Sequence, residues 1–292
     1  MVEVFLKKFT LWLVACGLLF ISCDLSEEVE QVFPPPEIPA RDIFELDFTG
    51  ITSAPTGYKE LNEPDWISGT ISDSDYAIVI EDPFRLALGF INDFRRGMMS
   101  QLSSIFQSTF HNVNKLEPEE IDGVYIWNYS ANIFDPNMGY PMQRSDLKLT
   151  ADREENGLVT WRLFKITETD QVLIAIGESI PHYLKGEWIF FYHDGLNLPA
   201  FHFNWERKRE KTSLFQSKLH FVNVATTYQK EGDWVIHTQD RQESLENSLF
   251  AEVRWNHRTG EGSIFVRIDS INEEIKRCWN QLRESIDECP DE

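Results

Sequence analysis

Residues 200–207 read Ala-Phe-His-Phe-Asn-Trp-Glu-Arg and give a clear pattern of alternating side chains. Successive side chains of a β-strand point to opposite faces of the sheet. The aromatic residues Phe201, Phe203 and Trp205 therefore share one face, and the polar residues between them share the other. This stretch predicts a strand with a buried aromatic face and a polar face turned toward solvent.

Nine further segments between Gly123 and Asp269 have a similar character, and turn signals such as Asn156-Gly157 and Asp194-Gly195 separate them. Consecutive short strands without intervening helices pair as an antiparallel meander. The predicted fold class is mainly β (α+β), with an antiparallel meander of about ten strands forming a curved sheet, half-barrel or barrel. The ten predicted strands are Val124–Ile133, Asp146–Asp152, Val159–Thr167, Val172–Gly177, Glu187–His193, Ala200–Arg207, Lys218–Thr226, Trp234–Thr238, Phe250–His257 and Ser263–Asp269.

Two helices are expected to cover this sheet. Asp82 is a suitable N-cap, Pro83 stands at the first helical position, and apolar residues follow at helical spacing as far as Phe106. A C-terminal helix is expected over residues 270–286, because Ser270-Ile271-Asn272-Glu273 matches a capping box.

Two short strands are expected before the long helix. Residues 43–51 alternate, with three apolar side chains on one face, and residues 76–80 form a short apolar run. A single β-rich globular domain is therefore expected over residues 43–292.

The N-terminal residues have the layout of a secretory signal peptide, expected over residues 1–22. Lys7-Lys8 precede an apolar run over residues 9–21, which falls short of the roughly 20 residues that a transmembrane helix needs. Leu19-Phe20-Ile21-Ser22-Cys23 resembles a bacterial lipobox, and the resemblance implies that Cys23 is lipidated and begins the mature protein. Lipidation at Cys16 and an uncleaved membrane span are the alternatives. We favour Cys23, because acidic residues follow it at once.

Residues 23–42 are expected to form a tether between the lipid and the domain. This stretch is acidic and contains Pro34-Pro35-Pro36, and polyproline chains extend by about 3.1 Å per residue. The diacylglyceryl group of bacterial lipoproteins supplies the two acyl chains that stable anchoring needs. The expected location is the cell envelope, on the periplasmic face of the inner or outer membrane or at the cell surface.

The charge of the chain limits the partners that it can have. Its formal net charge is −21, which repels phosphate backbones and anionic lipid headgroups. Nucleic-acid binding is therefore excluded as an expected function. Membrane contact is expected to come from the acyl chains on Cys23.

Cys278 and Cys289 are the two cysteines outside the signal and the lipobox. An exported protein meets an oxidising compartment, so a disulfide between them is chemically admissible. On a continuous helix they would lie about 16 Å apart along the axis, too far for a disulfide. A bridge therefore requires the helix to end near residues 285–287, and two unpaired thiols are the alternative.

The sequence contains none of the local signatures of metalloproteases, serine hydrolases, nucleotide-binding loops or paired zinc cysteines. We therefore expect no catalytic residue, no metal ligand and no cofactor. His202 and Glu206 share one face of their strand and could bind zinc only with a histidine from a neighbouring strand. A hydrolase acting on glycans or peptides through scattered carboxylates or histidines is the alternative function.

The aromatic residues of the strands are the remaining candidates for function. Trp127, Trp188, Phe201 and Phe203 could face an apolar ligand, or they could pack the sheet against its helices. The order of anchor, helix and antiparallel meander resembles the lipid-binding and carrier half-barrel lipoproteins of bacterial envelopes. That resemblance implies a non-enzymatic role in binding or assembly, with an apolar ligand or an envelope protein as the partner.

Overall fold

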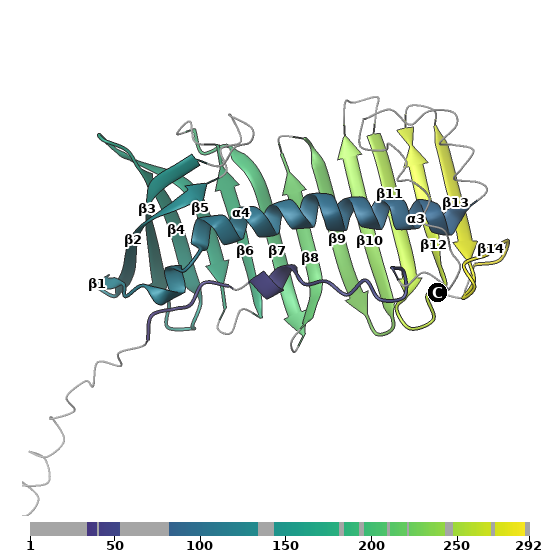
Figure 1. Ribbon diagram of the computed structural model, residues 1–292, viewed down its shortest axis with the longest axis horizontal. Helices are drawn as coiled ribbons and strands as arrows, with labels where there is room; N and C mark the ends of the chain where they lie inside the picture. The colour runs from purple at the N-terminus through teal and green to yellow at the C-terminus, as the bar shows by residue number, and fades with distance from the viewer. Residues whose placement is uncertain are drawn as a thin grey trace, which may run out of the picture. The chain divides into compact units, whose positions relative to one another are not determined.

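A computed structural model describes residues 34–39, 41–52, 82–133, 143–180, 184–192, 196–208, 211–220, 222–242, 248–269 and 272–289. Residues 36–292 form a compact unit of their own. The described part of this unit contains one 14-stranded antiparallel sheet, in which each strand pairs with the next strand along the chain (Figure 1). The first and last strands lie at opposite edges, so the sheet is open.

The strands follow one another in sequence order from one edge of the sheet to the other. They are β1 (Glu119–Ile121), β2 (Val124–Ile133), β3 (Gln143–Arg153), β4 (Val159–Ile166), β5 (Gln171–Ser179), β6 (Lys185–Phe191), β7 (Pro199–Lys208), β8 (Lys211–Leu219), β9 (Val224–Glu231), β10 (Trp234–Gln242), β11 (Ser248–Asn256), β12 (Gly262–Ile268), β13 (Glu273–Trp279) and β14 (Ser285–Ile286).

The antiparallel meander predicted from the sequence is confirmed, although the described strands number 14 instead of about ten. Nine of the predicted segments match single strands. The strand predicted at residues 218–226 is wrong, because a turn separates β8 from β9 inside it. Asn223 adopts a left-handed conformation there, with φ of 49°, which an asparagine tolerates better than most residues. The sequence gives no clear turn signal here because Val222 is apolar, but its side chain is 47% exposed.

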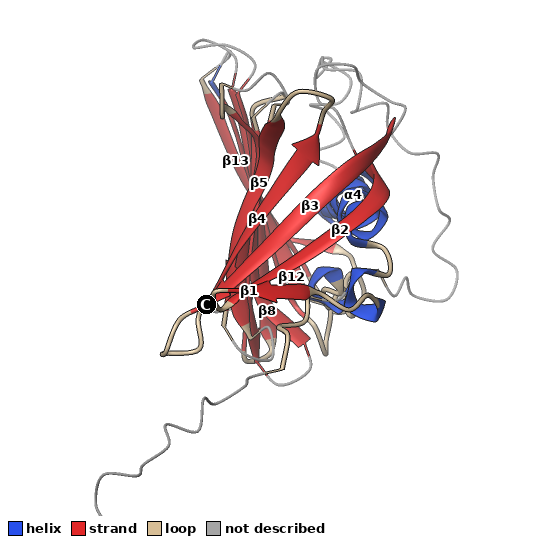
Figure 2. Ribbon diagram, turned by 90° about the vertical axis from the view of Figure 1, so that its left-hand side faces the viewer, coloured by secondary structure: helices blue, strands red, loops and turns tan. Residues whose placement is uncertain are grey.

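One long helical segment crosses the strands on one face of the sheet (Figures 1 and 2). It consists of α3 (Pro83–Asn92), the π-helical η3 (Asp93–Met99) and α4 (Ser100–Phe110), followed by the short 3-10 turn η4 (Val113–Lys115). The predicted cap is present, since the Asp82 side chain accepts a hydrogen bond from the Arg85 backbone N–H at 3.0 Å. The apolar side of the helix is buried against the sheet. Its buried apolar residues are Phe84, Leu86, Ala87, Phe90, Ile91, Phe94, Met99, Leu102, Ile105, Phe106 and Phe110.

The strand expected at residues 43–51 is not formed. The chain instead makes a 3-10 turn, η1 (Arg41–Phe44), and then continues across the sheet. We call residues 41–52, including η1, the strap. Side chains of the sheet satisfy its main chain: Tyr228 Oη bonds both polar backbone groups of Asp47, and Trp255 Nε1 donates to the Thr49 carbonyl at 3.0 Å. A segment that lies across strands has no strand edge to pair with. The strand expected at residues 76–80 lies outside the described residues.

The C-terminal helix expected over residues 270–286 is also wrong, because strands β13 and β14 occupy this region. Asn272 belongs to a turn, with a left-handed φ of 51° and a backbone N–H that donates to the Asp269 carbonyl. Ile275 and Trp279 are four residues apart, a spacing that suits both one side of a helix and one face of a strand. Pairing of β13 with β12 decides between the two.

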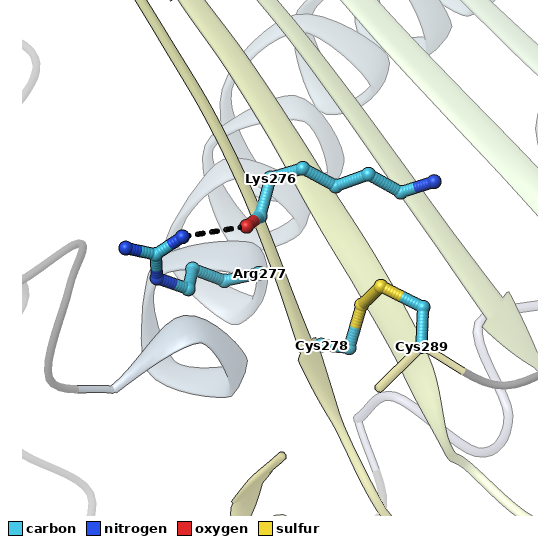
Figure 3. Close-up of a disulfide and its surroundings, with 4 residues drawn as sticks. All are labelled: Lys276, Arg277, Cys278 and Cys289. Carbon is cyan, nitrogen blue, oxygen red and sulfur yellow. Dashed lines mark hydrogen bonds between the residues drawn. A yellow bond between two sulfur atoms is a disulfide. The ribbon is translucent and has the colours of Figure 1, made fainter. Parts of the chain in front are cut away.

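The tail folds back and places Cys289 beside β13, where a disulfide joins it to Cys278 (Figure 3). The two Cα atoms lie 5.2 Å apart. Cys278 alternates with Trp279, so the disulfide lies on the face of the sheet opposite the helix. Arg277 points to the other side of the strand and donates to the Lys276 carbonyl at 2.9 Å.

Glycines and tryptophans face each other on neighbouring strands. Gly177 lies between Trp161 and Trp188, and Gly186 lies opposite Trp205. A Cβ atom on Gly177 would come within 2.5 Å of the Trp188 ring, closer than any real contact. The missing side chain therefore makes room for the indole of the next strand.

This packing predicts that Gly177→Ala destabilises the domain, because the added Cβ would overlap the fully buried Trp188 ring. We expect the free energy of unfolding to fall by about 1–3 kcal/mol, as in other overpacked cores. Gly89→Ala is the matched control, since a Cβ there meets nothing within 4 Å and alanine favours a helix by about 0.5–1 kcal/mol. Chemical denaturation measures both changes. Equal stabilities of the two variants would contradict the packing argument.

Candidate functional site on the inner face of the sheet

The four aromatic residues singled out in the sequence all lie on the face that the helix covers, which we call the inner face. Trp188 and Phe203 are fully buried, and Trp127 and Phe201 are only 3% and 2% exposed. Trp188 pairs directly with Phe203 across β6 and β7, and Phe190 stacks on Phe201 with ring centroids 4.4 Å apart. These residues form part of one continuous core.

Phenylalanines of the helix cover this aromatic surface. The Phe106 ring lies 5.9 Å from the rings of Trp188 and Phe203, and the Phe110 ring lies 4.9 Å from Trp188. Phe44 of the strap adds a further contact, 5.3 Å from Phe203. The surface that an apolar ligand would touch is thus occupied by side chains of the same chain.

Polar residues gather on the inner face where η3 crosses the middle of the sheet. Ser217 of β8 and Thr226 of β9 are buried, and their hydroxyl oxygens lie 2.8 Å apart. Both hydroxyls point to the sulfur of Met98, at 3.2 and 3.4 Å. Gln239 of β10 pairs with Thr226 in the same row, and its Oε1 is buried without a hydrogen-bond partner among the described residues.

His237 of β10 lies beside this group and is 1% exposed. Phe94 of the helix covers the imidazole, with ring centroids 4.3 Å apart. Neither ring nitrogen has a partner with hydrogen-bonding geometry among the described residues. Burial lowers the pKa of His237 to about 3, and the smaller opposite effect of the Thr227 main chain does not offset it. The imidazole is therefore neutral at physiological pH.

A second polar group connects the strap to the sheet. Lys230 of β9 donates to the carboxylate of the buried Asp47 at 2.5 Å, and Thr49 donates to the other carboxylate oxygen. Burial alone would raise the pKa of Asp47, but the hydrogen bonds from Lys230 and Thr49 outweigh it and leave the pKa below its ordinary value. Burial raises the pKa of Tyr228, whose hydroxyl bonds the Asp47 main chain. These hydrogen bonds hold the strap against β9.

These groups are not arranged for nucleophilic catalysis. A catalytic serine needs a hydrogen bond to its general base, whereas the Ser217 hydroxyl contacts Thr226 and Met98. His202 lies 3.4 Å from Glu187, with no hydrogen bond to Glu206. In the described ranges, no group of three or more histidine, cysteine, aspartate or glutamate side chains is placed to hold a metal ion.

Cys23 and its lipobox lie outside the described residues, so lipidation at Cys23 stays a prediction. Of the helices that the structure describes, none combines the length and the apolar character needed to cross a membrane.

Comparisons with protein-family models, with curated proteins and with solved structures find no match to this chain.

Sequence reasoning missed the polar groups of the inner face. His237 alternates in phase with the buried Val235, a signal that could have placed it inside. Asp47 and Met98 gave no comparable signal, because their partners come from strands more than 100 residues away.

The neutral, buried His237 predicts a specific dependence of stability on pH. Its pKa is depressed in the folded state, so between pH 6.5 and about 3 the unfolded chain binds a proton that the folded chain does not. The free energy of unfolding therefore keeps the full contribution of this residue above pH 6.5. Between pH 6.5 and about 3 it decreases by about 1.4 kcal/mol for each pH unit.

Chemical denaturation at pH 7 and pH 4.5 tests this prediction in the His237→Leu variant. The wild-type protein should lose about 2–3 kcal/mol more than the variant over this interval. His111→Gln is the control for the loss of a histidine outside the core, because His111 is exposed. Identical pH dependence in the wild type and His237→Leu would contradict the prediction.

Proposed function

We propose that the protein is a lipid-anchored lipoprotein of the cell envelope, whose β domain binds another protein and carries out no reaction. One observation carries the choice of a protein over an apolar ligand. Phe106 and Phe110 of the helix cover Trp188 and Phe203, the aromatic surface that a lipid would need. The outer face and the edges of the sheet are then the surfaces left for binding.

The disulfide supports the proposed location. Cys278 and Cys289 are joined, and disulfides persist in exported proteins while the cytosol keeps thiols reduced. A domain that meets an oxidising compartment fits the lipobox resemblance at Leu19–Cys23.

The anchor is tested by Cys23→Ala. This variant lacks the thiol that would carry the acyl chains, so we expect it to move from the membrane fraction to the soluble fraction of its host. Cys16→Ala is the matched control and should stay with the membranes. Retention of Cys23→Ala in the membrane fraction after a carbonate wash would contradict the proposed lipid anchor.

The choice between a protein and an apolar ligand is tested by native mass spectrometry of the released Cys23→Ala protein. We expect the mass of the chain without a bound lipid, because the inner face is already filled. A lipid bound in stoichiometric amount would contradict the proposal and favour the carrier role.

A further inference from the structure

The two edges of the open sheet are covered to different extents. At one edge, β1 pairs with only Val124–Ile126 of β2, so residues 127–133 have no strand beside them on that side among the described residues. At the other edge, β14 pairs with only Cys278 and Trp279 of β13. Unpaired strand edges are templates for pairing with another chain, and proteins usually protect them.

The β13 edge carries such protection. The uncovered part of β13 contains four charged residues within five positions, namely Glu273, Glu274, Lys276 and Arg277. The disulfide at Cys278 holds the folded-back tail beside the same strand (Figure 3). Charged side chains on an edge strand oppose the approach of a second strand.

The β2 edge carries neither charges nor a tail held by a disulfide, although α4 packs against β2. Residues 127–133 read Trp-Asn-Tyr-Ser-Ala-Asn-Ile and contain neither a charge nor a proline. Asn128, Ser130 and Asn132 are exposed on the outer face, and their alternating neighbours belong to the inner face. In a chain with a net charge of −21, this edge strand is itself uncharged, and the Ser130 hydroxyl donates to the Asp146 carboxylate of β3 at 2.6 Å.

We propose that the β2 edge pairs with the β2 edge of a second copy of this chain, antiparallel and about a two-fold axis at Ser130. In this register, every residue of the stretch 127–133 pairs with a residue of the same stretch in the second copy. The partner's strand then ends opposite Trp127, where β1 begins to occupy the edge, and β2 itself ends at Ile133. The free length of the edge thus fits a second β2 without displacing β1.

The side chains of this register are self-complementary. On the inner face, Trp127 lies opposite the partner's Ile133, and Tyr129 lies opposite the partner's Ala131, so each large ring meets a smaller side chain. On the outer face, Asn128 lies opposite the partner's Asn132, and two serines meet on the axis. No like charges face each other, a condition that cross-strand pairs require. The inference needs neither the lipid nor another protein, so it goes beyond the proposed function.

Disulfide trapping tests the register directly. Residues directly opposite in an antiparallel pair have Cα atoms about 4.5–5.5 Å apart, within disulfide range. In membranes from cells that make the full chain with Ser130→Cys, mild oxidation should give a cross-linked dimer on a non-reducing gel. Gln216→Cys is the matched control, because Gln216 is equally exposed but belongs to the interior strand β8. It should give at least tenfold less dimer.

Paired charges at the flanking positions test the same register through the yield of the Ser130→Cys dimer. Added to Ser130→Cys, Asn128→Glu with Asn132→Glu places like charges opposite each other across the axis and should lower the dimer yield about tenfold. Asn128→Glu with Asn132→Lys places opposite charges there and should retain the yield. On β3, Lys148 and Arg144 lie beside these positions, so both glutamates of the first variant gain an opposite charge, whereas Asn132→Lys in the second variant places a lysine beside Arg144. The melting temperatures of both variants are therefore measured alongside the dimer yields.

Each outcome decides the proposal. A dimer that follows the charge pattern supports self-pairing at β2. Equal yields from Ser130→Cys and Gln216→Cys, or equal yields from the two charge variants with unchanged melting temperatures, overturn it. A Ser130→Cys cross-link to a different protein also overturns it, since the edge would then belong to that protein. The Cys23→Ala fractionation does not depend on any of these results.

Discussion

The helix and the sheet must match in spacing, because an open sheet leaves one entire aromatic face to be covered by elements from outside it. Phe84 lies over Trp279 of β13, with ring centroids 5.7 Å apart, and Phe94 lies over His237 of β10. Ten helical residues rise about 15 Å, and three strand spacings span about 14 Å. A helix that runs across the strands can therefore place one phenylalanine on every third strand.

The match continues over the next interval. Phe106 follows Phe94 by twelve residues and lies between β6 and β7, with its ring 5.9 Å from both Trp188 and Phe203. These strands lie three to four positions beyond β10, a span of about 14–19 Å. Twelve residues of a regular α-helix rise about 18 Å, which falls within that span, and this stretch includes the π-helical segment η3. The same segment covers Ser217, Thr226 and His237, where the inner face is polar and offers less apolar surface to a helix.

Much of this fold could be predicted from local patterns. The strand at residues 200–207 was found because Phe201, Phe203 and Trp205 alternate with polar residues, and the helix was found from Asp82, Pro83 and a long periodic stripe. The errors fall where tertiary contacts decide. Ile275 and Trp279 fit a helix and a strand equally well, and residues 43–51 alternate although their backbone bonds go to Tyr228 and Trp255.

The site was harder to predict than the fold, because its residues come together only through the meander. Trp188 and Phe203 were identified as aromatic positions, but their covering by Phe106 follows from where the helix crosses the sheet. His237 shows the same limit. Its burial can be read from its phase with Val235, whereas its contact with Phe94 depends on a match in spacing that no local pattern contains.

The chain enters the domain at the same end of the sheet as the free edge. Ile38 exchanges hydrogen bonds with the Asn114 side chain in η4, the turn that leads from α4 to β1. The domain therefore begins at the end of the sheet where β2 is uncovered, far from the charged β13 edge. A two-fold axis at Ser130 would bring the starting points of both domains to the middle of the pair. The two points where the chain enters its domain would then lie closer together than the two β13 edges, which face away from the axis.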